Sequence, residues 1–159
     1  MLGVGIEGLA LEEETASVNP AFSTIQLRAG LIINRYFSIQ GQTSIEVAAY
    51  EYEDSFDIYE TDDYSLESAY GVFAVPRLPL GDTVALYGRI GYVNTELDVG
   101  GFKSEGDGPG YGGGIEFDFS NGMTLGIDYT YYDLEFDIGV PPPVDITGGS
   151  FATTLQYRF

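Results

Sequence analysis

The chain has 159 residues, with 6 basic side chains against 25 acidic ones and a formal net charge of −19. This length predicts a single domain over residues 1–159, and the acidity argues against nucleic acid, because phosphate backbones bind basic surfaces. The sequence contains no Cys and no His. These absences exclude disulfide frameworks, thiolate or imidazole metal sites and Ser-His-Asp hydrolysis. We therefore expect neither a cofactor nor a metal centre.

The start of the chain carries no recognisable targeting segment. No run of 18 apolar residues occurs anywhere, which excludes a transmembrane helix. Residues 1–10 lack a basic region and a long apolar core, so we do not expect them to form a signal peptide. If the protein is exported, we expect this chain to be a mature or recombinant form without its signal.

Alternation of apolar and polar residues dominates the sequence, and this period of two is typical of β-strands. Eight segments show it, at residues 2–10, 22–33, 37–52, 65–75, 84–96, 111–119, 123–132 and 150–159. The 65–75 segment is the weakest, because Phe73 and Val75 are apolar on the face opposite Val72. Pro76 and Pro79 predict a turn directly after it.

The connections between these segments alternate in length. Short ones fall around residues 34–35, 78–82 and 120–122, and Asn121-Gly122 predicts a hairpin of type I′, which needs φ > 0 at both central residues. Long ones cover residues 11–21, 53–64, 97–110 and 133–149. The sequence therefore predicts an all-β fold, an eight-stranded antiparallel up-and-down barrel with its long loops at one end.

The two faces of the predicted strands decide between a membrane barrel and a soluble one. The polar face carries many small residues, at Gly3, Gly5, Gly30, Gly71, Gly91, Gly112, Gly114 and Gly126. Small residues suit the narrow interior of eight strands, while Leu, Ile, Val and Tyr on the other face suit lipid. Aromatic residues gather near strand ends, with Phe22, Tyr92 and Phe151 towards the long loops. A transmembrane barrel is the favoured interpretation, and a soluble lipocalin-like ligand barrel, with the apolar face inside, is the alternative.

Charged residues on the polar face predict a network in the interior. Its expected members are Glu7, Arg28, Glu46, Arg89, Glu116, Asp128 and Arg158, with Asp118 towards one end. Glu7 and Arg28 fall on neighbouring strands, as do Arg89 and Glu116, so we expect two ion pairs, since an unpaired buried charge costs several kcal/mol. A polar plug that fixes the barrel register is the favoured interpretation, and a gate on a narrow proton or cation path is the alternative.

Three segments give the chain a family resemblance. They are LYGRIGY at 86–92, YGGGIEF at 111–117 and the terminal LQYRF at 155–159. With the eightfold pattern, they resemble the small eight-stranded outer-membrane proteins of Gram-negative bacteria, the OmpX, OmpA-barrel and opacity-protein group. The resemblance implies a place in the bacterial outer membrane among lipid and lipopolysaccharide. It also implies that Leu155, Tyr157 and Phe159 form the signal read by the barrel-assembly machinery.

The long connections are strongly acidic, since 18 of the 25 acidic residues lie in or beside them, with Lys103 as the one base. Asp54, Asp57, Asp62 and Asp63 could hold Ca²⁺ loosely, although their spacing is not that of an EF-hand, and a solvated rim is the simpler interpretation. We expect a non-enzymatic, monomeric surface or structural protein whose loops make extracellular contacts. A narrow ion-conducting pore remains an alternative, and an enzyme working through Tyr or carboxylate groups remains formally open.

Overall fold

The computed structural model describes residues 1–12, 19–52, 58–60, 64–99, 102–137 and 144–159. Its strands are β1 (Leu2–Glu12), β2 (Asn19–Asn34), β3 (Phe37–Tyr52), β4 (Ile58–Glu60), β5 (Tyr64–Pro79), β6 (Val84–Val99), β7 (Phe102–Asp118), β8 (Met123–Asp137) and β9 (Val144–Tyr157). Within these ranges, no helix has the length and apolar character needed to cross a membrane.

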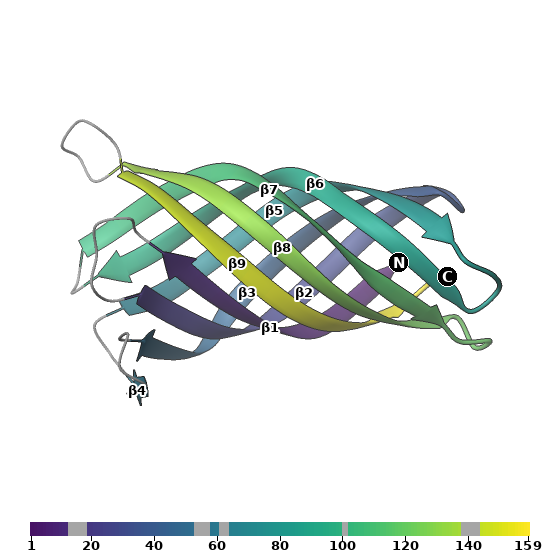
Figure 1. Ribbon diagram of the computed structural model, residues 1–159, viewed down its shortest axis with the longest axis horizontal. Coiled ribbons are helices and arrows are strands. Elements are labelled where there is room, and N and C mark those ends of the chain that lie inside the picture. The colour runs from purple at the N-terminus through teal and green to yellow at the C-terminus, as the bar shows by residue number, and fades with distance from the viewer. Residues whose placement is uncertain (13–18, 53–57, 61–63, 100–101, 138–143) are drawn as a thin grey trace.

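The eight long strands form one closed antiparallel ring. Their order is β2-β1-β9-β8-β7-β6-β5-β3, and β3 pairs back onto β2, while the short β4 extends the sheet beside the end of β3. Paired residues followed once around the ring from Asp107 lead back to β7 at Phe117, ten residues away. A stagger of this size requires strongly tilted strands, as Figure 1 shows. The predicted fold class is therefore confirmed.

The strands run further towards the long connections than the sequence predicts. The segment expected at 111–119 is part of a strand from Phe102, and the one expected at 123–132 continues to Asp137. A strand of 16 residues, such as β2, is about 50 Å long, whereas the lipid-facing band of an outer-membrane barrel is about 25 Å tall. The barrel is thus long enough to project well beyond such a band. Figure 1 shows both termini and the short turns at one end of the barrel, and the strand ends Glu12, Tyr52, Val99 and Asp137 at the other.

Two predicted turns differ from the observed ones. β5 continues through Pro76 to Pro79, and the turn follows at residues 80–83. The β5–β6 ladder tolerates Pro76 because pairing skips from Ala74 to Arg77 there. The hairpin predicted at Asn121-Gly122 forms, but the N–H of Gly122 donates to the carbonyl of Phe119 at 3.2 Å. Gly122, with φ +84°, is therefore the last residue of the turn instead of one of its two central residues.

An apolar belt encircles the outside of the barrel. Its exposed members include Leu2, Val4, Ile6, Ile25, Leu27, Leu31, Ile39, Ile45, Val72, Leu86, Ile90 and Leu155. Ile6 and Leu31 are 70% and 72% exposed. Soluble monomers rarely expose an apolar surface of this kind, and it fits lipid contact. The lipocalin-like alternative, which needs this face inside, is therefore wrong.

The chemistry of the two faces is inverted at the end with the long connections. There the interior holds an upper apolar cluster of Leu9, Leu11, Phe22, Leu66, Leu97, Leu134 and Phe136. Charged residues occupy the outside instead, as at Asp133 and Glu135 on either side of Leu134. Phe22, which the sequence places among the aromatic residues near the long loops, points inward because it follows the alternation of Thr24 and Gln26. The projecting part of the barrel thus packs like a soluble protein.

Glycines on the inner face leave room that the narrow interior needs. A Cβ added at Gly91 would lie 2.1 Å from the carbonyl oxygen of Val72 and 2.7 Å from the ring of Phe73. A Cβ at Gly112 would lie 2.0 Å from the carbonyl oxygen of Tyr129. By contrast, a Cβ at the outward-facing Gly8 would meet nothing within 4 Å. Small side chains on the inner face are therefore a steric requirement, as the sequence predicted.

We expect Gly91→Val to destabilise the folded barrel by about 1–3 kcal/mol, the usual cost of overpacking. Its side chain would press on backbone that the β-ladder holds in place. The matched control is Gly8→Val, which adds the same groups to open space. Urea unfolding in lipid vesicles measures both variants, and equal stabilities would contradict the steric argument.

Candidate functional site: the filled lumen and the acidic collar

The central ion-pair cluster is organised around Asp128 on β8. Arg28 Nη1 and Nη2 donate to the two carboxylate oxygens at 2.8 and 2.9 Å, and Arg89 Nη1 donates at 2.8 Å. Tyr87 Oη donates a fourth hydrogen bond at 2.7 Å. The side chains of Arg28, Arg89 and Asp128 are each 1% exposed. One carboxylate therefore joins β2, β6 and β8 across the lumen.

Polar and aromatic neighbours hold the two arginines of this cluster in place. Arg28 Nε donates to the Gln26 side chain, and Arg89 Nη2 donates to the Gln42 side chain. The Arg89 guanidinium also lies 4.0 Å from the ring centroid of Phe73, a cation–π contact. These side chains share the inner face because they occupy alternate positions of their strands.

A lower ion-pair cluster lies near the short turns. Arg77 and Arg158 each contact both Glu116 and Asp118, with Arg77 Nε 2.6 Å and Arg158 Nη2 2.7 Å from Glu116 Oε2. Thr124 Oγ1 donates to Asp118 at 2.8 Å. Two guanidinium groups and two carboxylates make this cluster electrically neutral. It joins β5 and β7 to the end of the chain.

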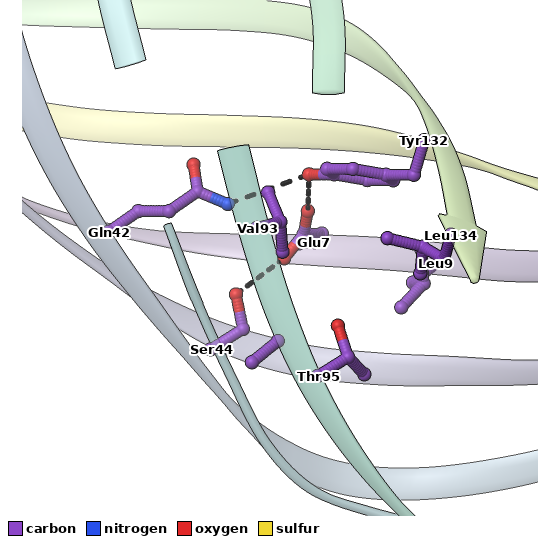
Figure 2. Close-up of a pocket in the computed structure, with 9 residues that line it drawn as sticks. Glu7, Leu9, Gln42, Ser44, Val93, Thr95, Tyr132 and Leu134 are labelled. Carbon is purple, nitrogen blue, oxygen red and sulfur yellow. Dashed lines mark hydrogen bonds between the residues drawn. The ribbon is translucent and has the colours of Figure 1, made fainter. Parts of the chain in front are cut away.

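Glu7 on β1 forms a third cluster from hydroxyl groups. Thr24 Oγ1 and Ser44 Oγ donate to Glu7 Oε2 at 3.1 and 2.8 Å, and Tyr132 Oη donates to Oε1 at 3.4 Å. Figure 2 shows the bonds of Glu7 with Ser44 and Tyr132, and Gln42 donates in turn to Tyr132 Oη at 3.5 Å. The described residues offer Glu7 no ion pair. A cavity of about 20 Å³ adjoins it, room for about one water molecule.

The predicted ion pairs are wrong in their partners. Glu7 contacts hydroxyl groups where Arg28 was expected, and Arg89 pairs with Asp128 instead of Glu116. Adjacent strands hold these residues at different heights, while the stagger of the ring brings more distant strands together across the lumen. Glu46 joins none of the three clusters, since its carboxylate accepts the backbone N–H of Leu66. The pairing of β5 with β3 ends at Ala69. The bond from Leu66 to Glu46 therefore joins β5 to β3 beyond the end of their ladder.

Arg77 is a cluster member that the sequence prediction missed. The prediction placed it in a turn, because Pro76 precedes it. A signal for its position was present, because Phe73, Val75 and Arg77 are alternate residues and so share one face of the strand. In the structure, Phe73 and Val75 are both buried in the interior. Continuing the alternation through Pro76 would have placed Arg77 in the lumen.

The predicted assembly signal lies on the outside of the barrel's last strand. Leu155 and Tyr157 face outward and are exposed, and Phe159, which follows the end of β9, is 83% exposed. The rings of Tyr157 and Phe159 are 6.4 Å apart. These positions leave the three side chains accessible, and their recognition by assembly machinery stays a prediction.

An acidic collar surrounds part of the projecting end. It consists of outward-facing residues of β5 to β9, namely Glu67, Glu96, Asp98, Glu105, Asp107, Asp133, Glu135 and Asp145. Several are direct cross-strand partners, as in the row Asp107–Glu135–Asp145 and the pair Glu96–Glu105. Like charges directly opposite one another destabilise a sheet.

Lys103 is the single base of the collar. Its ammonium group contacts Glu67 and lies 3.2 Å from Glu96. The hydrogen bond from Lys103 lowers the pKa of the Glu67 carboxyl, and the two carboxylates, Glu67 first, raise the pKa of the ammonium group. On β1 and β2, the outward-facing residues Gly8, Ala10 and Ser23 are uncharged. Among the side chains that the structure describes, the collar therefore lies on β5 to β9.

The described residues contain no group of three or more acidic side chains that could hold a metal ion. Asp54, Asp57, Asp62 and Asp63, the candidates for a loose Ca²⁺ site, lie outside the described residues. Inside the lumen, the carboxylates of Glu116, Asp118 and Asp128 are already engaged by arginines.

Comparison with solved structures shows which known proteins this barrel resembles. The structure resembles neisserial surface protein A, with a TM-score of 0.69 and 14% identity over 99% of this chain and 96% of that one. It also resembles Ail, the attachment invasion locus protein of Yersinia pestis, with a TM-score of 0.58 and 19% identity over the same shares of the two chains. A weaker likeness, to the outer membrane enzyme PagL, has a TM-score of 0.47 and carries no argument about activity.

No curated protein sequence matches the chain significantly. The model of the family described as "Outer membrane protein beta-barrel domain" matches residues 2–159, which is nearly the whole sequence. The closed eight-stranded ring, the apolar belt and the filled polar lumen agree with that match. The chain belongs to the outer membrane protein β-barrel family.

Proposed function

We propose that this chain is a sealed, non-enzymatic surface barrel that anchors an acidic collar in the bacterial outer membrane. The observation that carries the proposal is the filled lumen. From the short turns upward, the lower cluster, the central cluster, the Glu7 cluster and the upper apolar cluster follow one another. The chain's distinctive chemistry therefore lies on its outer surface.

A conducting pore fits this interior poorly. Eight strands enclose a space that side chains just fill, and the arginines of the central cluster reach across it to a shared carboxylate. Above them, Leu11, Leu66 and Phe136 are each 1% exposed. An ion would have to displace buried ion pairs and then cross an apolar layer, both of which are costly.

An enzyme also fits poorly. The carboxylates best placed for acid–base work, Glu116 and Asp128, are held by two arginines each. The cavity beside Glu7 has room for about one water molecule, which is too little for an organic substrate. The sequence contains no His or Cys to act as a nucleophile or proton shuttle.

The collar is the surface that we assign to extracellular contacts. One crystal structure of Ail holds that protein in complex with the heparin analogue sucrose octasulfate, a polyanion. The collar of this chain carries eight carboxylates and one lysine, so we infer a preference for cationic partners instead. We further propose that lipid and lipopolysaccharide surround the belt and that the assembly machinery binds the chain during biogenesis. We also propose that the folded barrel is a monomer.

The sealed lumen predicts an absence of conductance. In planar bilayers, the refolded full chain should insert without giving a steady open-channel current. A cold-versus-boiled gel on the same preparation shows whether the protein is folded. A reproducible open state from folded protein would contradict the sealed barrel and favour the narrow pore.

The central cluster predicts a large effect of removing one charge. Asp128→Asn keeps the size of the side chain but leaves the buried Arg28 and Arg89 without their carboxylate, so we expect a loss of about 3–5 kcal/mol in the free energy of unfolding. Asp133→Asn, an exposed change on the same strand, should stay within about 0.5 kcal/mol. Equal effects in urea unfolding would show that the ion pairs do not stabilise the barrel.

The collar predicts selective retention on charged matrices. Folded protein in detergent should pass through immobilised heparin and bind immobilised polylysine in a salt-sensitive way. Combining Glu105→Gln, Asp107→Asn and Glu135→Gln should lower the salt concentration needed for elution. The matched control neutralises Glu12, Glu13 and Glu14, which removes the same charge from residues that are not members of the collar. An equal shift in both variants would mean that net charge, and not the collar, governs binding.

A further inference from the structure

The cavity beside Glu7 is lined mainly by oxygen-bearing and apolar side chains. Glu7, Ser44, Thr95 and Tyr132 contribute the oxygens, and Leu9, Ala69, Val93 and Leu134 close the space on its apolar side, with Gln42 completing the lining. Figure 2 shows Glu7 joined by dashed bonds to Ser44 and Tyr132, with Thr95 beside them and without such a bond. The cavity is thus a small, buried pocket with a carboxylate in its wall.

Thr95 is the unexplained polar group of this pocket. The residue is 2% exposed and lines the cavity, and none of the hydrogen bonds that link Glu7, Ser44, Tyr132 and Gln42 includes its hydroxyl. Polar groups inside proteins generally have a hydrogen-bond partner. Because Thr95 borders the cavity, an occupant of the cavity can supply a partner for its oxygen.

The formal charges of the inward-facing side chains sum to −1. The inward-facing acids are Glu7, Glu46, Glu116, Asp118 and Asp128, and the inward-facing bases are Arg28, Arg77, Arg89 and Arg158. All four guanidinium groups lie in the lower and central clusters. Glu7 and Glu46 have no ion pair within the described part of the chain, and the route from Glu7 to Arg89 runs through Tyr132 and Gln42.

We propose that this cavity binds one sodium ion, held by the Glu7 carboxylate and the hydroxyl oxygens of Ser44 and Thr95. One monovalent ion matches the single carboxylate that lines this cavity, whereas a divalent ion would leave a buried positive charge beside it. The oxygen-only ligands suit a hard cation. The space admits about one water-sized body, which favours sodium over larger monovalent ions. This inference is independent of what the collar contacts.

Sodium-dependent stability tests the site. The full chain is refolded in zwitterionic detergent at constant pH and ionic strength, with sodium chloride progressively replacing choline chloride. The unfolding midpoint, read from heated gel samples, should rise saturably with sodium, by about 2–4 °C or more at high occupancy. Choline is too large to enter the cavity. It therefore keeps the ionic strength, and with it the screening of charges, constant without occupying the proposed site.

Two variants locate the effect. Glu7→Gln keeps the side chain's shape but removes its charge, and should abolish the sodium-dependent rise. Thr95→Val keeps the packing and removes one oxygen, and should shift the rise to at least severalfold higher sodium, which keeps the test available if the first variant folds poorly. Glu67→Gln, which neutralises an exposed acid of the collar, should respond to sodium as the parent chain does.

Three outcomes would overturn the proposal. One is a midpoint that does not depend on the ratio of sodium to choline, which would mean that the pocket holds no sodium ion. Another is an unchanged sodium response in a folded Glu7→Gln variant. The third is an unchanged response in Thr95→Val, which would place the sodium effect outside this cavity.

Discussion

The structure depends on closing a hydrogen-bonded ring of eight strands. Lipid offers no partner to backbone N–H and carbonyl groups, so a sheet can stand in a membrane only without free edges. Here the pairing of β1 with β9 completes the ring, and a stagger of ten residues sets its tilt and width. The narrow interior that results explains why Gly91 and Gly112 have no room for a side chain. It also explains why a few long polar side chains suffice to fill the lumen.

The barrel meets two different surroundings along its length. Beside the apolar belt, Arg28, Arg89 and Asp128 are inside and Ile6 and Leu27 are outside. Beyond the belt, apolar side chains are inside and the collar carboxylates are outside. The same period of two serves both parts, because successive residues of a strand point to opposite faces. One continuous wall therefore combines a membrane barrel with a projecting barrel that has a soluble protein's core.

Most of the fold could be predicted from the sequence, because alternation reports which side of a strand each residue faces. Arg28, Arg89 and Asp128 were correctly placed inside on this basis. Their contacts could not be predicted, since Asp128 on β8 meets Arg28 on β2 across the lumen, and that meeting depends on the stagger of the whole ring. Alternation within single strands carries no information about stagger, so only neighbouring strands were considered as partners.

The strand ends were missed for a different reason. At Leu134 and Phe136 the alternation continues, but the acids that flank them resemble those of a solvated loop. The segment through Pro76 was missed because proline usually ends a strand, although this one lies where the β5–β6 pairing is interrupted. In both cases a local rule was correct in general and was overridden by the position of the residue in the ring.

The distribution of charge separates what stabilises the barrel from what it presents. Four of the six basic residues lie in the lumen, where they hold three carboxylates and join distant strands. The collar keeps Lys103 alone against a row of carboxylates whose mutual repulsion weakens the sheet. Features that lower stability and are nevertheless present are the ones to examine for function. Glu7, which has no ion pair within the described residues, is a further feature of this kind inside the lumen, and with the Thr95 hydroxyl that lines the same cavity it leads to the sodium site.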